Sequence, residues 1–160
     1  MRWLIDGYNV ILSNEKLAKL MRQNPESARD ELIRTVLNSG IARESVTIVF
    51  DGKHSGSIQT PAKNLEIIFS SLPETADDVI KKKVGMSSSR RSTVVVSDDR
   101  SIRNFARECG AGVLGSREFL SYLSEKKRKV SFEKRSEKPE PSGSVDAELL
   151  RLFTENKKKN

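Results

Sequence analysis

Short apolar runs alternate with helical patterns along the first 123 residues, and this alternation restricts the fold more than any other feature of the chain. The runs have the length and composition of strands and cover residues 3–5, 46–50, 65–69, 93–96 and, more weakly, 111–114. Three of the five are continuously apolar, as in strands covered on both faces. The sequence therefore predicts a single α/β domain with a mainly parallel central sheet flanked by helices.

Helical patterns are clearest in three segments between the runs. The first begins at Asn24 and Pro25, which suit the cap and first turn of a helix. The second begins at Thr75, which forms an apparent capping box with Asp78 three residues later. The third has one apolar face over residues 102–109. These helices are expected to connect the parallel strands.

The C-terminal part of the chain differs from the rest in charge. Residues 126–160 hold 11 Lys and Arg against 6 Asp and Glu, which is +5 of the formal net charge of +7. We expect a folded domain over residues 1–124, a charged flexible linker over 125–144, and an amphipathic helix with a basic end over 145–160. Such a basic segment is typical of chains that bind a polyanion such as nucleic acid, although a solubilising tail has the same composition.

Acidic residues occur at the ends of three predicted strands and in the first turn of one predicted helix. They are Asp6, Asp51, Asp77, Asp78, Asp98 and Asp99. Because ligand sites of open parallel sheets lie beyond the carboxyl ends of the strands, these side chains are expected to converge. Each acid alone is commonly a turn residue or a helix cap, which is the simpler explanation for Asp78 and Asp99. Their coincidence favours a shared site.

A cluster of carboxylates needs a cation, since like charges raise one another's pKa. Mg²⁺ and Mn²⁺ suit such a cluster because they prefer oxygen ligands and keep several waters. Two such ions can activate a water and stabilise the leaving oxygen during attack on a phosphodiester. Near Asp6, Gly7 is expected to let the chain turn sharply, and Asn9 to orient a ligand or water without adding charge. This pattern favours a nuclease.

The chain resembles the NYN-domain ribonucleases of the YacP-like branch, whose fold is similar to the PIN domain, in four stretches: LIDGYNVI, IVFDGK, ETADDVIKK and VVVSDDRSIRNFARECGAGVLGSREFLSYL. The resemblance implies a metal-dependent endoribonuclease that uses Mg²⁺ or Mn²⁺ and acts on single-stranded or exposed RNA. The catalytic residues that it implies are Asp6, Asn9, Asp77 and Asp98, of which the three aspartates bind the metal. Asp51, Asp78 and Asp99 are further acidic candidates.

Basic residues near the acidic doublets fit an RNA substrate. The candidates are Lys81, Lys82, Arg90, Arg91, Arg100 and Arg103. Contacts between such residues and phosphates hold a strand without reading its sequence. A solvated helix face is an equal alternative for the lysines. The resemblance also permits association with the ribosome, which the residues themselves do not address.

Two other functions remain open at this point. One is an RNA-binding adaptor whose nuclease-like domain is inactive. The other is a magnesium-dependent phosphotransfer or phosphohydrolase domain. It is disfavoured because receivers need an acidic pair after the first strand, and haloacid-type hydrolases need DxD where this chain has DGY. With one cysteine, Cys109, and no apolar run of membrane length, the chain is expected to be cytoplasmic and to have no membrane contact.

Overall fold

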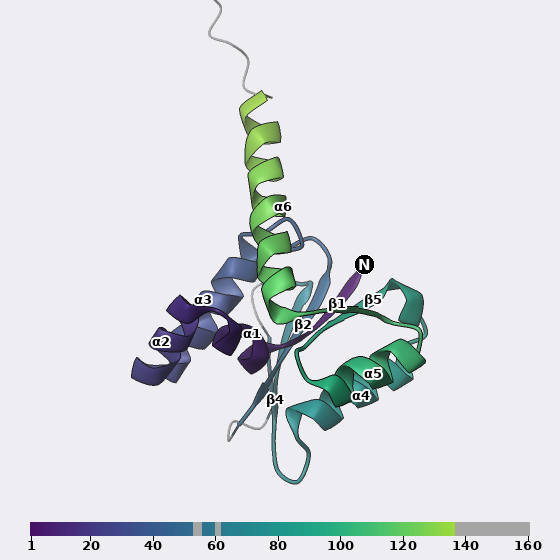
Figure 1. The fold of residues 1–160 in the computed structure, drawn as a ribbon. Coiled ribbons are helices and arrows are strands. Elements are labelled where there is room, and N and C mark those ends of the chain that lie inside the picture. Colours follow the sequence, from purple (N-terminus) through teal and green to yellow (C-terminus); the bar gives the residue numbers. More distant parts are fainter. Residues whose placement is uncertain (53–55, 60–61, 137–160) are drawn as a thin grey trace, which may run out of the picture. The chain divides into compact units, whose positions relative to one another are not determined.

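The computed structural model describes residues 1–52, 56–59 and 62–136 (Figure 1). The chain divides into two units, residues 1–127 and 128–160. The first contains a six-stranded sheet with strand order β3-β4-β2-β1-β5-β6. The strands are β1 (Arg2–Asp6), β2 (Ser45–Asp51), β3 (Gly56–Gln59), β4 (Leu65–Ser70), β5 (Thr93–Val96) and β6 (Gly112–Leu114).

The predicted α/β class is confirmed, and so is the mainly parallel sheet. Five strands are parallel to their neighbours, whereas β3 pairs with β4 in the antiparallel direction. All five predicted strands are present, with bounds within two residues of those expected. Strand β3 was not predicted because its four residues, GSIQ, contain a single large apolar side chain and give no periodic signal.

Six α-helices in the described residues connect and cover the strands. They are α1 (Gly7–Ser13), α2 (Glu15–Gln23), α3 (Pro25–Leu37), α4 (Ala76–Met86), α5 (Arg100–Glu108) and α6 (Ser116–Ser136), and the 3₁₀ turn η1 (Arg90–Ser92) precedes β5. The predicted helix starts are confirmed, since Asn24 caps α3 and Thr75 forms a complete capping box with Asp78 at α4. Helices α1 and α2 were not predicted.

The strands are covered on both faces because their side chains alternate. Trp3 and Ile5 belong to the core cluster that also contains residues of α1, α2, α3 and α6. Leu4 belongs to a second cluster formed with α4 and α5. Figure 1 shows the same arrangement, with α4 and α5 on the opposite side of the sheet from α1, α2 and α3. Helices α1, α4, α5 and α6 each follow a parallel strand, so their N-termini lie at the carboxyl edge of the sheet.

The predicted flexible linker over residues 125–144 is wrong for residues 125–136, which continue α6 to Ser136. This stretch is rich in Glu, Lys and Arg and has no Gly or Pro, so its composition favours a helix in spite of its charge. Residues 126–136 hold six Lys and Arg against one Glu, so the net +5 of residues 126–160 lies within α6. The remaining linker and the predicted helix over 145–160 lie outside the described residues. No helix in the described part of the chain is both long and apolar enough to cross a membrane.

Candidate active site

Asp6 ends β1 and caps α1, and three donors fix its carboxylate. Its Oδ1 accepts the backbone N–H of Asn9 at 3.1 Å, and its Oδ2 accepts hydrogen bonds from the Asn9 side-chain amide and from the Ser97 hydroxyl, the latter at 3.3 Å. The side chain is only 5% exposed. Asn9 therefore acts on Asp6 through both its backbone and its side chain, which is why an amide three residues after the acid fits this site.

Gly7 does not make the sharp turn that we expected, since it is the first residue of α1 and its φ is not positive. Its role is to leave space. A Cβ at this position would lie 2.2 Å from Cε1 of Phe50, a ring buried beneath α1. The glycine therefore lets α1 begin directly on the sheet, which places Asn9 within reach of Asp6.

Two carboxyl groups at the carboxyl edge have raised pKa values. Burial is the main cause of the raised pKa of Asp6, and the charge of Asp77 raises it further. Burial also raises the pKa of Asp77, followed by the charge of Asp99, while Lys81 opposes the shift and Asp51 adds to it. Four acids from β1, β2, α4 and the start of α5 thus interact in one region, which we call the acidic cluster: Asp6, Asp51, Asp77 and Asp99.

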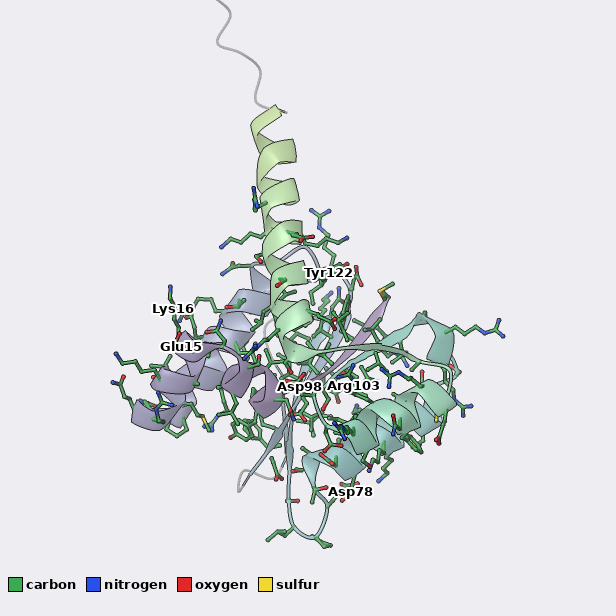
Figure 2. All side chains as sticks on the ribbon, in the orientation of Figure 1. Glu15, Lys16, Asp78, Asp98, Arg103 and Tyr122 are labelled. Carbon is green, nitrogen blue, oxygen red and sulfur yellow. The ribbon has the colours of Figure 1, made fainter. Side chains whose placement is uncertain are left out.

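The two members of the ADD doublet have different roles. Asp78 Oδ2 accepts both the backbone N–H of Thr75 at 3.0 Å and its hydroxyl at 2.8 Å, and these bonds lower the pKa of Asp78. Asp78 is therefore used to start α4, where Figure 2 labels it. Asp77 is half-buried and belongs to the acidic cluster, and its assignment as a metal ligand stays a prediction.

In the SDD doublet the second acid, Asp99, both caps a helix and acts on the acidic cluster. Asp99 caps α5, because its Oδ1 accepts the N–H of Ile102 at 3.0 Å, and its charge acts on Asp77. Asp98 Oδ1 accepts the N–H of Ser116 at 2.9 Å, which ties the end of β5 to the start of α6. Asp98 also lines a pocket with Asn9. The assignment of Asp98 as a metal ligand stays a prediction.

Asp51 is exposed at the end of β2, where its Oδ1 accepts the Ser70 hydroxyl at 2.6 Å. Ser70 ends the neighbouring strand β4, with which Asp51 is in register. Asp51 therefore lies at the same sheet edge as Asp6 and contributes charge there, while one of its oxygens is already hydrogen-bonded.

The donor chemistry of the acidic cluster fits a hard divalent cation, although the side chains are not closely grouped. Carboxylates that raise one another's pKa are relieved by a cation, and Mg²⁺ is typically held by one or two carboxylates with several waters. Within residues 1–52, 56–59 and 62–136, no three Asp, Glu, His or Cys side chains come together as a ready metal site. Asp6 and Asp77, with Asp98 or Asp99, are the residues that would hold such an ion.

Four of the six basic candidates belong to α4 or α5, and the other two belong to η1. Lys81 is close enough to lower the pKa of Asp77, and its Nζ donates to the Ser101 hydroxyl at 2.8 Å. Lys82 instead forms an ion pair with Glu74 at 3.5 Å. Arg100 is the exposed first residue of α5, and Arg103 lies one turn later on the same helix.

Arg90 and Arg91 do not lie beside the acidic cluster. Both belong to η1, which precedes β5 and therefore lies at the amino edge of the sheet, opposite Ser97 and Asp98. Arg90 donates to the carbonyl of Gly85 at 2.6 Å at the end of α4. Arg90 and Arg91 are close to the SDD stretch in sequence, but the four-residue strand β5 lies between them. The arginines and the acids are therefore at opposite edges of the sheet.

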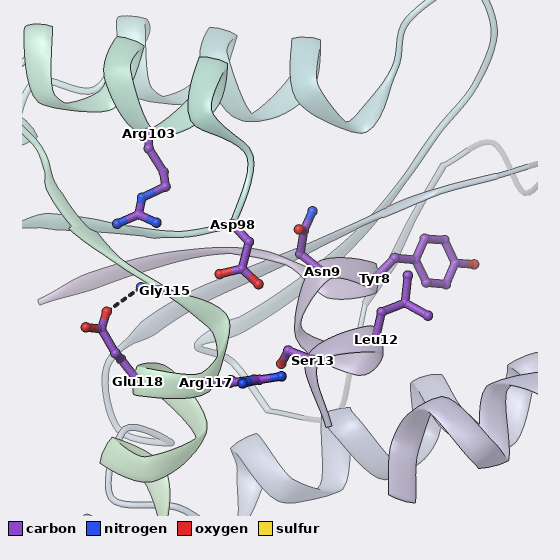
Figure 3. Close-up of a pocket in the computed structure, with 9 residues that line it drawn as sticks. All are labelled: Tyr8, Asn9, Leu12, Ser13, Asp98, Arg103, Gly115, Arg117 and Glu118. Carbon is purple, nitrogen blue, oxygen red and sulfur yellow. Dashed lines mark hydrogen bonds between the residues drawn. The ribbon is translucent and has the colours of Figure 1, made fainter. Parts of the chain in front are cut away.

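A pocket of about 600 Å³ adjoins this region, and Figure 3 shows the side chains that line it. Its residues come from α1, from the end of β5, from α5 and from the start of α6. They are Tyr8, Asn9, Leu12, Ser13, Asp98, Arg103, Gly115, Arg117 and Glu118. Figure 2 labels two of them, Asp98 and Arg103.

Sequence reasoning had identified only Asn9, Asp98 and Arg103 among these pocket residues. Tyr8 and Leu12 were missed because α1, with seven residues, is too short for its periodicity to be recognised. Their spacing of four was the available signal, since it places them on one helix face. Arg117 and Glu118 follow a glycine turn that carried no metal-ligand pattern.

Comparison with known proteins gives consistent results for both sequence and fold. The model of the YacP-like NYN domain matches residues 3–158. A Bacillus subtilis (strain 168) protein described as uncharacterized protein YacP is 28% identical over 158 residues, which cover 94% of this chain and 92% of the relative. The crystal structure of Rae1 (YacP) from Bacillus subtilis has a TM-score of 0.70 at 28% identity and covers 99% and 95% of the two chains. A crystal structure of a single-substitution mutant of Rae1 gives 0.71 at 26% identity, with 94% and 91% covered.

Proposed function

Because the chain belongs to the YacP-like NYN domain family, we propose that it is a metal-dependent endoribonuclease whose active site is the acidic cluster at the carboxyl edge of the sheet. The observation that carries the proposal is the position of Asp6, Asp51, Asp77 and Asp99 at strand ends and helix starts along one edge of the sheet, where burial is the main cause of the raised pKa of Asp6 and of Asp77. Burial and mutual repulsion hold these acids in an unfavourable state that a divalent cation would relieve. Perturbed acids that converge from separate elements are typical of catalytic sites.

The residues of the site have distinct roles in this proposal. Asp6 and Asp77 of the acidic cluster, together with Asp98, which is outside the cluster and follows β5, would hold Mg²⁺ or Mn²⁺, and the bound metal would supply an activated water and stabilise the leaving oxygen. Asn9 and Ser97 keep the Asp6 carboxylate in one orientation through their hydrogen bonds. Lys81, next to Asp77, is placed to hold a substrate phosphate at the edge of the cluster.

The substrate class that we propose is single-stranded or exposed RNA. The +7 net charge of the chain favours a polyanion, and the cationic excess in α6 adds affinity that does not depend on sequence. The proposal includes association with the ribosome only because RNA is exposed there.

One observation favours a second candidate, an RNA-binding adaptor without activity. In the described part of the chain, the acids are not grouped as a ready metal site, as expected if the cluster has lost its catalytic use. An adaptor would bind RNA without metal-dependent cleavage. Membership of the family gives no support to a phosphotransfer function.

Incubation of the purified protein with end-labelled RNA separates these functions. Cleavage is expected with Mn²⁺ or Mg²⁺ and not with EDTA, and Asp6→Asn should abolish it. Asp30→Asn is a matched control because it makes the same charge change at an exposed position of α3. Binding without cleavage at any metal concentration would establish the adaptor instead.

A further inference from the structure

The pocket beside the acidic cluster is lined by side chains of different chemistry. One wall is α1, where Tyr8 and Leu12 lie one helical turn apart. Two guanidinium groups also line the pocket, Arg103 from α5 and Arg117 from α6, and Figure 3 shows them apart from each other, with Arg117 beside Ser13. The pocket, of about 600 Å³, falls in the range of small-molecule sites.

The apolar wall consists of an aromatic ring held by its neighbours and a leucine that is largely exposed. Leu12 is 65% exposed although it is a large hydrophobic residue. The Tyr8 ring is fixed edge-on against Phe50 with centroids 5.2 Å apart, and its hydroxyl accepts a hydrogen bond from Arg29 at 3.1 Å. A fixed aromatic ring beside an exposed aliphatic side chain is a surface to which a planar base can bind without prior ordering.

The Arg103 guanidinium group has a donor that is not used within the described part of the chain. Arg103 Nε is buried without a hydrogen-bond partner. Within residues 1–52, 56–59 and 62–136, neither Arg103 nor Arg117 forms an ion pair. A buried donor without a partner is unfavourable, and a phosphate oxygen is a strong acceptor for a guanidinium group.

The two carboxylates that line the pocket form no ion pair with Arg103 or Arg117 in the described residues, and one oxygen of each is bonded at the start of α6. Asp98 Oδ1 accepts the N–H of Ser116, and Glu118 Oε2 accepts the N–H of Gly115 at 2.8 Å. Figure 3 shows the latter bond and the Arg103 guanidinium group nearby. The pocket therefore presents one unpartnered donor of Arg103 and the exposed guanidinium group of Arg117, together with the apolar surface of Tyr8 and Leu12, and this combination complements a nucleotide.

We propose that this pocket binds one unpaired nucleotide of single-stranded RNA immediately beside the scissile phosphate, a location that rests on the proposed function. The base lies against Tyr8 and Leu12, and the phosphate lies at Arg103 and Arg117. Asn9 connects this subsite to the cluster, since it lines the pocket and binds Asp6. A base paired in a duplex cannot enter, so the pocket makes the protein select unpaired RNA.

The first test measures equilibrium binding of a labelled, unstructured 12-nucleotide RNA in EDTA, so that the result does not depend on cleavage. Arg103→Gln and Leu12→Ser are each expected to weaken binding about tenfold, within the range measured for base stacking and charged hydrogen bonds. Arg107→Gln on the exposed face of α5 and Met86→Ser, 78% exposed at the end of α4, are matched controls expected to change binding less than about twofold. Annealing the RNA into a duplex should weaken binding and remove the effect of Leu12→Ser.

A second test moves a single abasic nucleotide along the same RNA. One position should weaken binding to the wild-type protein about tenfold, and Leu12→Ser should remove that penalty because the base no longer has its surface. Equal penalties in both proteins, or equal effects of Arg103→Gln and Arg107→Gln, would overturn the subsite. Binding of this pattern without cleavage would refute the nuclease and leave the subsite standing, whereas cleavage with unchanged binding in the variants would refute the subsite alone.

Discussion

The pKa of Asp6, at the end of β1, is raised first by burial and then by the charge of Asp77 in the first turn of α4. The two acids come from elements far apart in the sequence, so this interaction exists only in the folded chain. The folded state therefore disfavours the ionised form of Asp6. Protonation of Asp6, or a cation bound beside it, would stabilise the folded protein.

Replacement of Asp6 by Asn should stabilise the metal-free protein at high pH. The folded pKa of Asp6 lies above its ordinary value of 3.8, so wild-type stability falls as pH rises from the ordinary value through the folded pKa. Asn cannot ionise and still caps α1. Urea unfolding in EDTA should show Asp6→Asn to be more stable than wild type at pH 8, with a smaller difference at pH 3. A difference of the same size at both pH values would contradict this explanation, and Asp30→Asn should show no pH-dependent gain.

The ADD doublet should respond asymmetrically to mutation. Asp77→Asn is expected to lower metal-dependent RNA cleavage at least about 100-fold, since it removes a proposed metal ligand. Asp78→Asn should retain most of the cleavage, because the Asp78 carboxylate is engaged with Thr75. Initial rates across a Mn²⁺ titration measure both variants. Equal losses would mean that the capping acid also takes part in the site.

Gly7→Ala should destabilise the fold by about 1–3 kcal/mol, the usual cost of overpacking. The added Cβ would lie 2.2 Å from Cε1 of the fully buried Phe50 ring. Gly85→Ala is the contrasting control. It lies inside α4 with only Phe105 Cζ nearby, at 3.9 Å, and should be neutral or stabilising by up to about 1 kcal/mol. Guanidinium unfolding of the three proteins measures both effects, and a neutral Gly7→Ala would show that α1 can shift.

Lys81 and Arg91 should differ in their effect on a short RNA. Lys81→Gln is expected to lower kcat/KM about tenfold for a hexanucleotide, since Lys81 lies beside Asp77. It should also move the acidic limb of the pH–rate profile to higher pH, because Lys81 opposes the burial-driven rise in the pKa of Asp77. Arg91→Gln should leave both unchanged for this substrate, because Arg91 lies at the opposite edge of the sheet. A large effect of Arg91→Gln would show that even a short RNA reaches that edge.

The basic half of α6 should carry the salt dependence of binding to long RNA. Joint replacement of Arg128, Lys129, Lys134 and Arg135 by Gln is expected to weaken binding and to lower the slope of log K against log salt by about 0.7 for each lost phosphate contact. Truncation after Ser136 is the control. It removes five Lys and Arg and five Asp and Glu and should leave the slope unchanged. The reverse result would assign RNA affinity to residues 137–160.

The sequence by itself determined the elements whose signals are local. Strand runs were found from their apolar composition, and α3 and α4 from the caps at Asn24 and Thr75. Such signals act within a few residues, so they survive without knowledge of the fold. The same reasoning located the strand-end acids, because parallel strands end at a common edge. Strand β3 and the helical residues 125–136 were not predicted. The first has almost no apolar residues, and the charge of the second suggested a flexible linker.

Only the tertiary structure decided how side chains from different elements meet. It assigned Asp78 to a cap and Asp77 to the acidic cluster, and it placed Arg91 at the far edge of the sheet. It also brought Leu12 and Arg103 to one pocket. These relationships depend on strand order and register and on the space that Gly7 leaves over Phe50. Distances between elements are set by packing across the whole domain, and no local sequence signal encodes them.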